Sequence, residues 1–242
     1  MKVKYFIVLI TFLIATAAAC GHDRIRKESV SIDPDGEIMI VCPRGDIKID
    51  TTDGGKIRWA AVLKSDTKDE VKKTIIPFKA DNRSFEILPG DDLRKSNVTI
   101  DHELQVPEQL TSVRLTALGG NIRARGSYKG IEFKTVNGTI DFKGGFTGGT
   151  ISSANGDIEL YAEDELKGNI DIQSTNGSVT MFFPREAAFR IDAFTKTGII
   201  RNDFNLPVKD EPEGYTLKGT VKDGNHTVKI NTVNGKIKLL RK

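Results

Sequence analysis

The chain has 242 residues, of which 38% are hydrophobic and 29% are charged, so its composition is that of a folded soluble domain and excludes a disordered tail. Its formal net charge of +3 gives no electrostatic footprint for nucleic acid, and no nucleic-acid partner is expected. The two cysteines, Cys20 and Cys42, exclude a disulfide framework and a cysteine-based metal site.

Residues 1–19 have the features of a signal peptide. Lys2 and Lys4 precede an apolar run from Tyr5 to Ala15 that is too short to span a bilayer. Ala17-Ala18-Ala19-Cys20 resembles the lipobox of bacterial lipoproteins, although that motif usually has leucine where Ala17 stands. The resemblance implies that Cys20 is the lipidated first residue of an exported protein. Such a protein is anchored to a membrane of the bacterial cell envelope and faces the periplasm or the cell surface.

The same residues also fit an ordinary A-x-A cleavage site, which would release a soluble protein beginning with Cys20. A Cys20–Cys42 disulfide stays open under that alternative. If Cys20 carries lipid, Cys42 is predicted to be a half-buried strand residue and not a reactive thiol.

Residues 20–29 are predicted to form a polar leader, and residues 30–112 an N-terminal β region that leads into a set of repeats. Strand signals in this region are VSID, EIMIV, DIKID and KIRWAAVL, separated by glycines. Thr67 and Glu70 have capping-box spacing, which predicts one short helix over the following residues, with Val71 and Ile75 facing inward. No other helix is expected.

From residue 113 to residue 242 one pattern recurs six times: alternating apolar residues, a small residue, a glycine-containing dipeptide and a second alternating run. Alternation predicts strands with one buried face, and glycine tolerates the positive φ that a sharp bend needs. The predicted repeat-turn residues are Gly120, Asn137, Gly138, Asn155, Gly156, Asn176, Gly177, Gly198, Asn234 and Gly235.

The repeat of about 20 residues predicts an all-β parallel solenoid. Each copy has one marker glycine, and these are Gly120, Gly138, Gly156, Gly177, Gly198 and Gly235. Apolar residues agree from copy to copy when the copies are aligned on these glycines, so stacked coils would place like residues on like residues. A chain of Asn-Gly hairpins is the alternative, because Asn-Gly between alternating runs is also a hairpin signal. The inward positions are Leu115, Phe133, Ile151, Ile172, Ala193 and Ile230 before the bend, and Ile122, Ile140, Ile158, Val179, Ile200 and Ile237 after it.

The period is broken at about residues 205–225, which are predicted to be an insertion made of a mobile loop, a strand and a return to the last coil. The repeated T-x-N-G units, the TGIIRNDFNLP segment and the closing LKGTVKDGNHTVKINTVNGKIKL resemble the "putative adhesin" family of bacterial domains of unknown function. The resemblance implies a right-handed β-helix in an exported or membrane-attached protein, and it implies no catalytic residues.

Asp141 and Glu159 would lie on neighbouring coils about 5 Å apart, which is the carboxyl separation of a retaining glycosidase. The alternative is an exposed ladder of solvated charges near Arg123. No aromatic platform for a sugar is expected beside them. The three histidines are scattered, so neither a metal site nor a cofactor is predicted.

These observations predict a non-catalytic, lipid-anchored envelope protein whose solenoid serves as a binding, adhesion-like or structural module. Its expected partners are the membrane, through the lipid, and an envelope protein or polysaccharide. The alternatives are an envelope carbohydrate-active enzyme on a β-helix scaffold and a self-assembling envelope scaffold.

Overall fold

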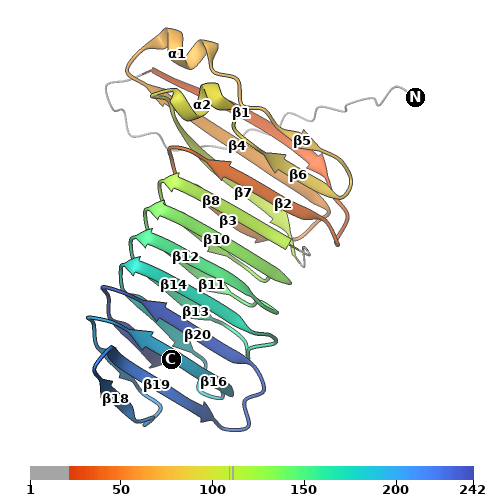
Figure 1. Cartoon of the computed structure of the whole chain (residues 1–242). Helices are drawn as coiled ribbons and strands as arrows, with labels where there is room; N and C mark the ends of the chain where they lie inside the picture. The colour runs from red at the N-terminus through yellow and green to blue at the C-terminus, as the bar shows by residue number, and fades with distance from the viewer. Residues whose placement is uncertain (1–21, 109, 111) are drawn as a thin grey trace.

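The computed structural model describes residues 22–108, 110 and 112–242. The predicted signal peptide and the predicted lipidation site, Cys20, lie outside the described residues. In the described part, two long sheets face each other around one hydrophobic core and form an elongated stack (Figure 1). No helix within these residues is long and apolar enough to cross a bilayer.

Ten described strands form the first sheet, and eleven form the second. The order in the ten-stranded sheet is β1 (His22–Ser31), β4 (Lys56–Ser65), β7 (Thr99–Pro107), β3 (Ile47–Thr52), β9 (Ile122–Arg125), β11 (Ile140–Gly144), β13 (Ile158–Ala162), β15 (Val179–Phe183), β21 (Ile237–Arg241) and β17 (Ile200–Asn202). The order in the eleven-stranded sheet is β18 (Val208–Glu211), β19 (Gly214–Val221), β16 (Phe189–Thr195), β20 (Thr227–Thr232), β14 (Ile170–Asn176), β12 (Gly149–Asn155), β10 (Gly130–Asn137), β8 (Ser112–Gly119), β2 (Glu37–Cys42), β6 (Ser84–Ile87) and β5 (Lys79–Ala80).

The repeats form a parallel solenoid, as the sequence predicts. Each repeat contributes one strand to each sheet. Corresponding strands of neighbouring coils pair in parallel and bring equivalent residues together, so Phe133 lies beside Ile151 and Ile140 lies beside Ile158. The hairpin alternative is wrong, because the two halves of a repeat belong to different sheets. β2 and β3, within residues 30–112, form a further coil that stacks on β8 and β9.

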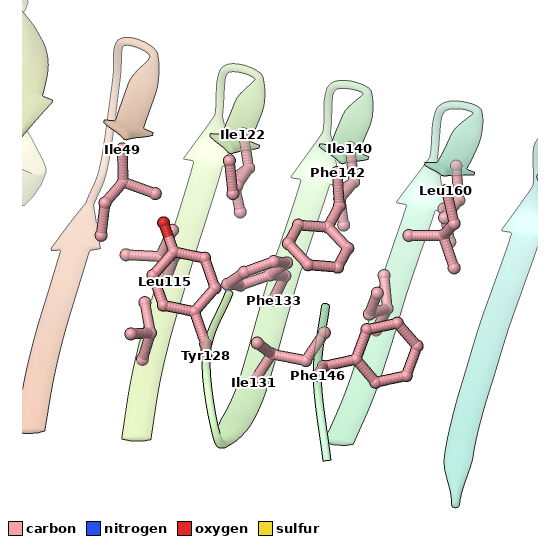
Figure 2. Packing of buried hydrophobic residues seen from close by; sticks show 14 of the residues in the cluster. Ile49, Leu115, Ile122, Tyr128, Ile131, Phe133, Ile140, Phe142, Phe146 and Leu160 are labelled. Atoms are coloured by element: carbon pink, nitrogen blue, oxygen red, sulfur yellow. The ribbon is translucent and has the colours of Figure 1, made fainter. Parts of the chain in front are cut away.

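The core lies between the two sheets and consists of the predicted inward columns. Figure 2 shows Leu115 and Phe133 from one sheet pointing toward Ile122 and Phe142 from the other. The rings of Phe133 and Phe142 lie edge to face at 5.7 Å across the core. All twelve inward positions named from the sequence are buried. Burial of each such aliphatic or aromatic side chain contributes about 1.5–3 kcal/mol, so the repeated columns supply most of the cohesion between coils.

The marker glycines form a ladder in which the backbones of neighbouring coils touch. A Cβ atom added to Gly138 would lie 2.0 Å from the carbonyl oxygen of Gly120, and one added to Gly156 would lie 2.0 Å from that of Gly138. The prediction that these glycines supply a positive φ is wrong for five of the six, since only Gly156 has one, at 156°. Glycine is needed at the others because a side chain would collide with the adjacent coil. The further contacts of this ladder join Gly120 to Gly45, Gly177 to Gly156, Gly235 to Gly177 and Gly198 to Gly235.

The small residue before each dipeptide is buried and supports the same ladder. Thr135 Oγ1 donates to the Gly120 carbonyl oxygen at 3.0 Å, and Thr232 Oγ1 donates to that of Gly177 at 3.1 Å. Ser174 occupies the same column, and its hydroxyl is the one buried side-chain polar atom among the described residues without a hydrogen-bond partner. The hydroxyl column therefore ties coils together at most levels of the stack.

The coils do not stack in chain order. β20 lies between β14 and β16, and β21 lies between β15 and β17, so the last copy in the sequence is inserted between the fourth and the fifth. The sequence prediction that successive copies are neighbours is correct for the first four copies and wrong for the last two. Since every coil presents the same column of residues, the repeat pattern cannot specify which coil follows which.

The predicted insertion at about 205–225 forms a β-hairpin at the end of the stack. β19 pairs antiparallel with β16, and β18 pairs antiparallel with β19. The strand β18 replaces the mobile loop that was expected before β19. This hairpin covers the edge that β16 would otherwise expose, and the short, charged strand β18 becomes the edge of the sheet, which disfavours edge-to-edge pairing.

The other end of the stack is closed by an antiparallel meander and two helices. β1 pairs with β4, and β4 with β7. Strand β1 includes residues of the predicted polar leader, which are therefore part of the sheet from His22 onward. Helix α1 (Lys68–Lys73) begins after Thr67, whose side chain accepts a hydrogen bond from the Glu70 backbone as predicted.

Two details of the predicted helix region are wrong. A second helix, α2 (Asp91–Lys95), follows Gly90, which makes no side-chain cap hydrogen bond and so left no capping signal in the sequence. Ile75 is 76% exposed and Ile76 is buried instead, because the helix ends at Lys73 and the chain continues in an extended conformation.

Candidate binding surface

The outer face of the ten-stranded sheet carries two parallel columns of side chains that run along the solenoid. Strand alternation places every second residue on this face. The first column is Lys48, Arg123, Asp141, Glu159, Thr180 and Lys238, continued by Arg201. The second column is Asp50, Arg125, Lys143, Tyr161, Phe182 and Leu240.

Asp141 and Glu159 are neighbours across β11 and β13, as predicted. Arg125 holds the Asp141 carboxylate with two hydrogen bonds, Nη1 to Oδ1 at 2.9 Å and Nη2 to Oδ2 at 2.6 Å. Arg123 Nε adds an ion pair with Oδ2 at 3.5 Å. A carboxylate fixed by a bidentate arginine is a structural charge pair, and both of its oxygens are already engaged.

Glu159 is engaged by a different partner. The Tyr161 hydroxyl donates to Glu159 Oε1 at 2.6 Å, and this hydrogen bond raises the pKa of Tyr161. A shallow recess of about 500 Å³ surrounds these groups. Its lining consists of Arg125, Asp141, Lys143, Glu159, Tyr161, Glu163 and Lys242.

Tyr161 and Phe182 form an aromatic pair that the sequence analysis missed. Their rings are stacked, with centroids 4.2 Å apart and planes 3° apart. Lys242 Nζ lies 5.8 Å from the Tyr161 ring and donates to the Ala162 carbonyl oxygen at 2.8 Å. Both aromatics are half-buried, so part of each is available to a ligand. The expectation that no aromatic lies beside the carboxylate pair is therefore wrong. Aligning the residues five positions after each marker glycine would have revealed the pair, because Tyr161 follows Gly156 and Phe182 follows Gly177 at that spacing.

A second recess, of about 430 Å³, lies on the same face nearer to β1, and its charged lining consists of five acidic and three basic side chains. Lys48 Nζ lies 2.8 Å from Glu103 Oε1, and Lys64 Nζ lies 2.8 Å from Asp101 Oδ2. These hydrogen bonds raise the pKa of both lysines. Among the described residues, no group of three or more His, Cys, Asp or Glu could hold a metal ion. The recess offers two ion pairs, further carboxylates and the Asn121 amide to a polar ligand.

The predicted repeat-turn residues lie at the bends between the two sheets and form an exposed asparagine ladder. Asn155 Nδ2 donates to Asn137 Oδ1 at 2.9 Å, Asn176 Nδ2 donates to Asn155 Oδ1 at 2.8 Å, and Asn234 Nδ2 donates to Asn176 Oδ1 at 2.8 Å. Because the amides bind one another, the ladder reinforces the stacking of the coils.

Cys42 lies in the buried column of small residues, beside Ala117. Burial, aided by the nearby charge of Asp101, raises the pKa of its thiol to about 12. Its Sγ lies 3.3 Å from the Ile100 carbonyl oxygen. The residue is fully buried and not half-buried as predicted, and its thiol is protonated and covered.

Fold and surface together define an all-β solenoid with a charged, ladder-lined face. The chain belongs to the Toastrack DUF4097 family, whose model matches residues 38–240. No curated protein matches it. Two similar solved structures are a "putative cell adhesion protein" of Clostridium sporogenes and a "putative adhesin" of Bacteroides fragilis. Each is 13% identical to this chain and covers 90% of it. The match spans 100% of the first protein, with a TM-score of 0.51, and 97% of the second, with a TM-score of 0.47.

Proposed function

We propose that this protein is a non-catalytic binding module of the bacterial cell envelope, anchored by lipid on Cys20. It holds an elongated partner, an envelope polysaccharide or protein, along the outer face of the ten-stranded sheet. The observation that carries the proposal is this continuous face, with its two recesses and the Tyr161–Phe182 pair in its second column. Stacked coils make long, regular surfaces suited to extended ligands.

The carboxylate pair supports binding better than hydrolysis. Asp141 is fixed by Arg125, and Glu159 accepts a hydrogen bond from the Tyr161 hydroxyl, so each carboxylate already has a structural partner. A glycosidase of this geometry needs one carboxyl group free to attack and the other free to donate a proton. The similar structure from Clostridium sporogenes is described as a "putative cell adhesion protein", which supports the proposal of a binding role.

Replacing Tyr161 by alanine is expected to weaken binding of purified envelope polysaccharide or protein by about fivefold or more, because an aromatic anchor of an interface contributes over about 1 kcal/mol. The matched control is Phe194→Ala, which removes a half-buried aromatic from the outer face of the other sheet. Binding is measured on immobilised protein against separated polysaccharide and protein fractions of the native envelope. An equal loss in both variants would contradict the assigned face, and shortened glycan products that vanish in Asp141→Asn would support the enzyme alternative.

Cys20→Ser is expected to move the protein from the membrane fraction to the soluble fraction, or to leave it uncleaved. The several acyl chains of a mature lipoprotein bind a bilayer firmly, whereas a chain without lipid has no anchor. The measurement is fractionation together with incorporation of radiolabelled fatty acid. Wild-type protein that takes up no label would end the lipoprotein hypothesis and favour the soluble, A-x-A-cleaved form.

A further inference from the structure

The chain enters the fold at one corner of the α1 end of the stack. His22, the first residue of β1, pairs with Ser65, the last residue of β4, and α1 begins three residues later. Figure 1 shows α1 and α2 at the end of the stack opposite β18. The entry point, the end of β4 and the start of α1 therefore share one corner of this end.

The same end carries the most exposed large hydrophobic side chains among the described residues. These are Ile75 at 76%, Ile25 at 46% and Leu88 at 44%, from the segments after α1, in β1 and before α2. Single exposed apolar residues are common on protein surfaces, but here the three highest values fall in elements that close the same end. Exposed apolar side chains in three elements of one end make that end the more apolar of the two.

Ile75 is held in an outward position by its neighbours. Arg24 Nη1 donates to the Lys72 carbonyl oxygen at 3.0 Å, and Arg26 Nη1 donates to the Ile76 carbonyl oxygen at 2.8 Å. Ile76 is buried, so the extended chain directs Ile75 away from the core. Two arginines of β1 thus fasten this segment to the strand that directly follows the predicted anchor.

The surroundings of Ile75 suit a lipid headgroup layer. Lys72 and Lys73 are exposed in the last turn of α1, where their long side chains can reach headgroups while Ile75 enters the apolar layer. Asp66 and Asp69 are also exposed at this corner, so the local charge is nearly balanced. Contact with lipid would therefore depend on the anchor and the apolar groups more than on attraction to anionic lipid.

The length of chain before β1 decides the orientation. Cys20 is two residues from His22, and two residues span at most about 7 Å. We propose that the α1 end of the stack rests on the lipid bilayer, with Ile75 at the interface and the solenoid projecting outward. This inference rests on the lipid anchor of the proposed function. With neighbouring strands about 4.8 Å apart, the ten-stranded sheet would extend about 40 Å outward from the membrane surface, and its outer face would be accessible along that length.

The test compares the two ends of the lipidated protein on vesicles of phosphatidylethanolamine and phosphatidylglycerol that contain headgroup-level nitroxide quenchers. An environment-sensitive fluorophore is attached at Ile75→Cys or, as the matched control, at Val208→Cys in β18, which is 37% exposed at the opposite end. The native Cys42 is buried and does not compete for the label. Quenching at position 75 is expected to exceed quenching at position 208 severalfold, and to disappear without vesicles.

Equal quenching at both positions in vesicle-bound, lipidated protein would overturn the orientation and leave the anchor intact. Protein that incorporates no fatty acid at Cys20 would overturn both the anchor and the orientation. Stronger quenching at position 208 would reverse the proposed direction of the solenoid.

Discussion

Gly138→Ala is expected to destabilise the protein by at least about 4 kcal/mol, which would leave little folded protein at moderate denaturant. The new Cβ would lie 2.0 Å from the Gly120 carbonyl oxygen, well inside van der Waals contact. Two coils would have to separate, which breaks the hydrogen bonds from Gly120 N to Asn137 O and from Ile122 N to Thr139 O. Chemical denaturation measures the free energy of unfolding.

The matched control is Gly55→Ala, because a Cβ at Gly55 meets no atom within 4 Å. That variant is expected to stay within about 0.5 kcal/mol of the wild-type stability. If both variants were equally stable, the glycine ladder would not be a steric requirement, and the backbone contact between coils would have to be looser than the structure shows.

Acidification is expected to destabilise the fold through His102 by about 3 kcal/mol. His102 is buried at 3% exposure, and burial lowers its pKa from 6.5 to about 4. Trp59 Nε1 donates to His102 Nδ1 at 3.1 Å, so the folded state requires that nitrogen to be unprotonated. Below about pH 6.5 the His102 side chain is protonated in the unfolded chain but stays neutral in the folded protein. Stability is therefore full above that pH and is lost as the pH falls toward about 4.

The measurement is the free energy of unfolding against pH, with His102→Gln as the comparison, because glutamine can accept the Trp59 hydrogen bond but does not titrate. Surface carboxylates titrate alike in both proteins, so the difference between the two curves isolates His102. Parallel curves from pH 7 to pH 4 would show that this histidine is hydrated or protonated in the folded state.

Within the candidate surface, the sequence identified the first column and missed the second. Alternation alone placed Asp141 beside Glu159, and the structure confirms that pair. Tyr161 and Phe182 were equally visible five residues after Gly156 and Gly177, but that column was not aligned. The partners of the carboxylates could not be predicted from the columns. Arg125 lies on the neighbouring strand and in the neighbouring column, and its side chain reaches Asp141 diagonally.

Within the repeats, the sequence by itself determined which residues face inward and where each coil bends, and it favoured parallel stacking over hairpins. It could do so because a two-residue alternation and repeated side-chain volumes record each residue's own environment. Only the tertiary structure decided that β20 and β21 enter between earlier coils and that five marker glycines are fixed by contact and not by φ. These features depend on which edges meet. Because the coils have nearly identical edges, no local sequence feature specifies which coil is adjacent to which.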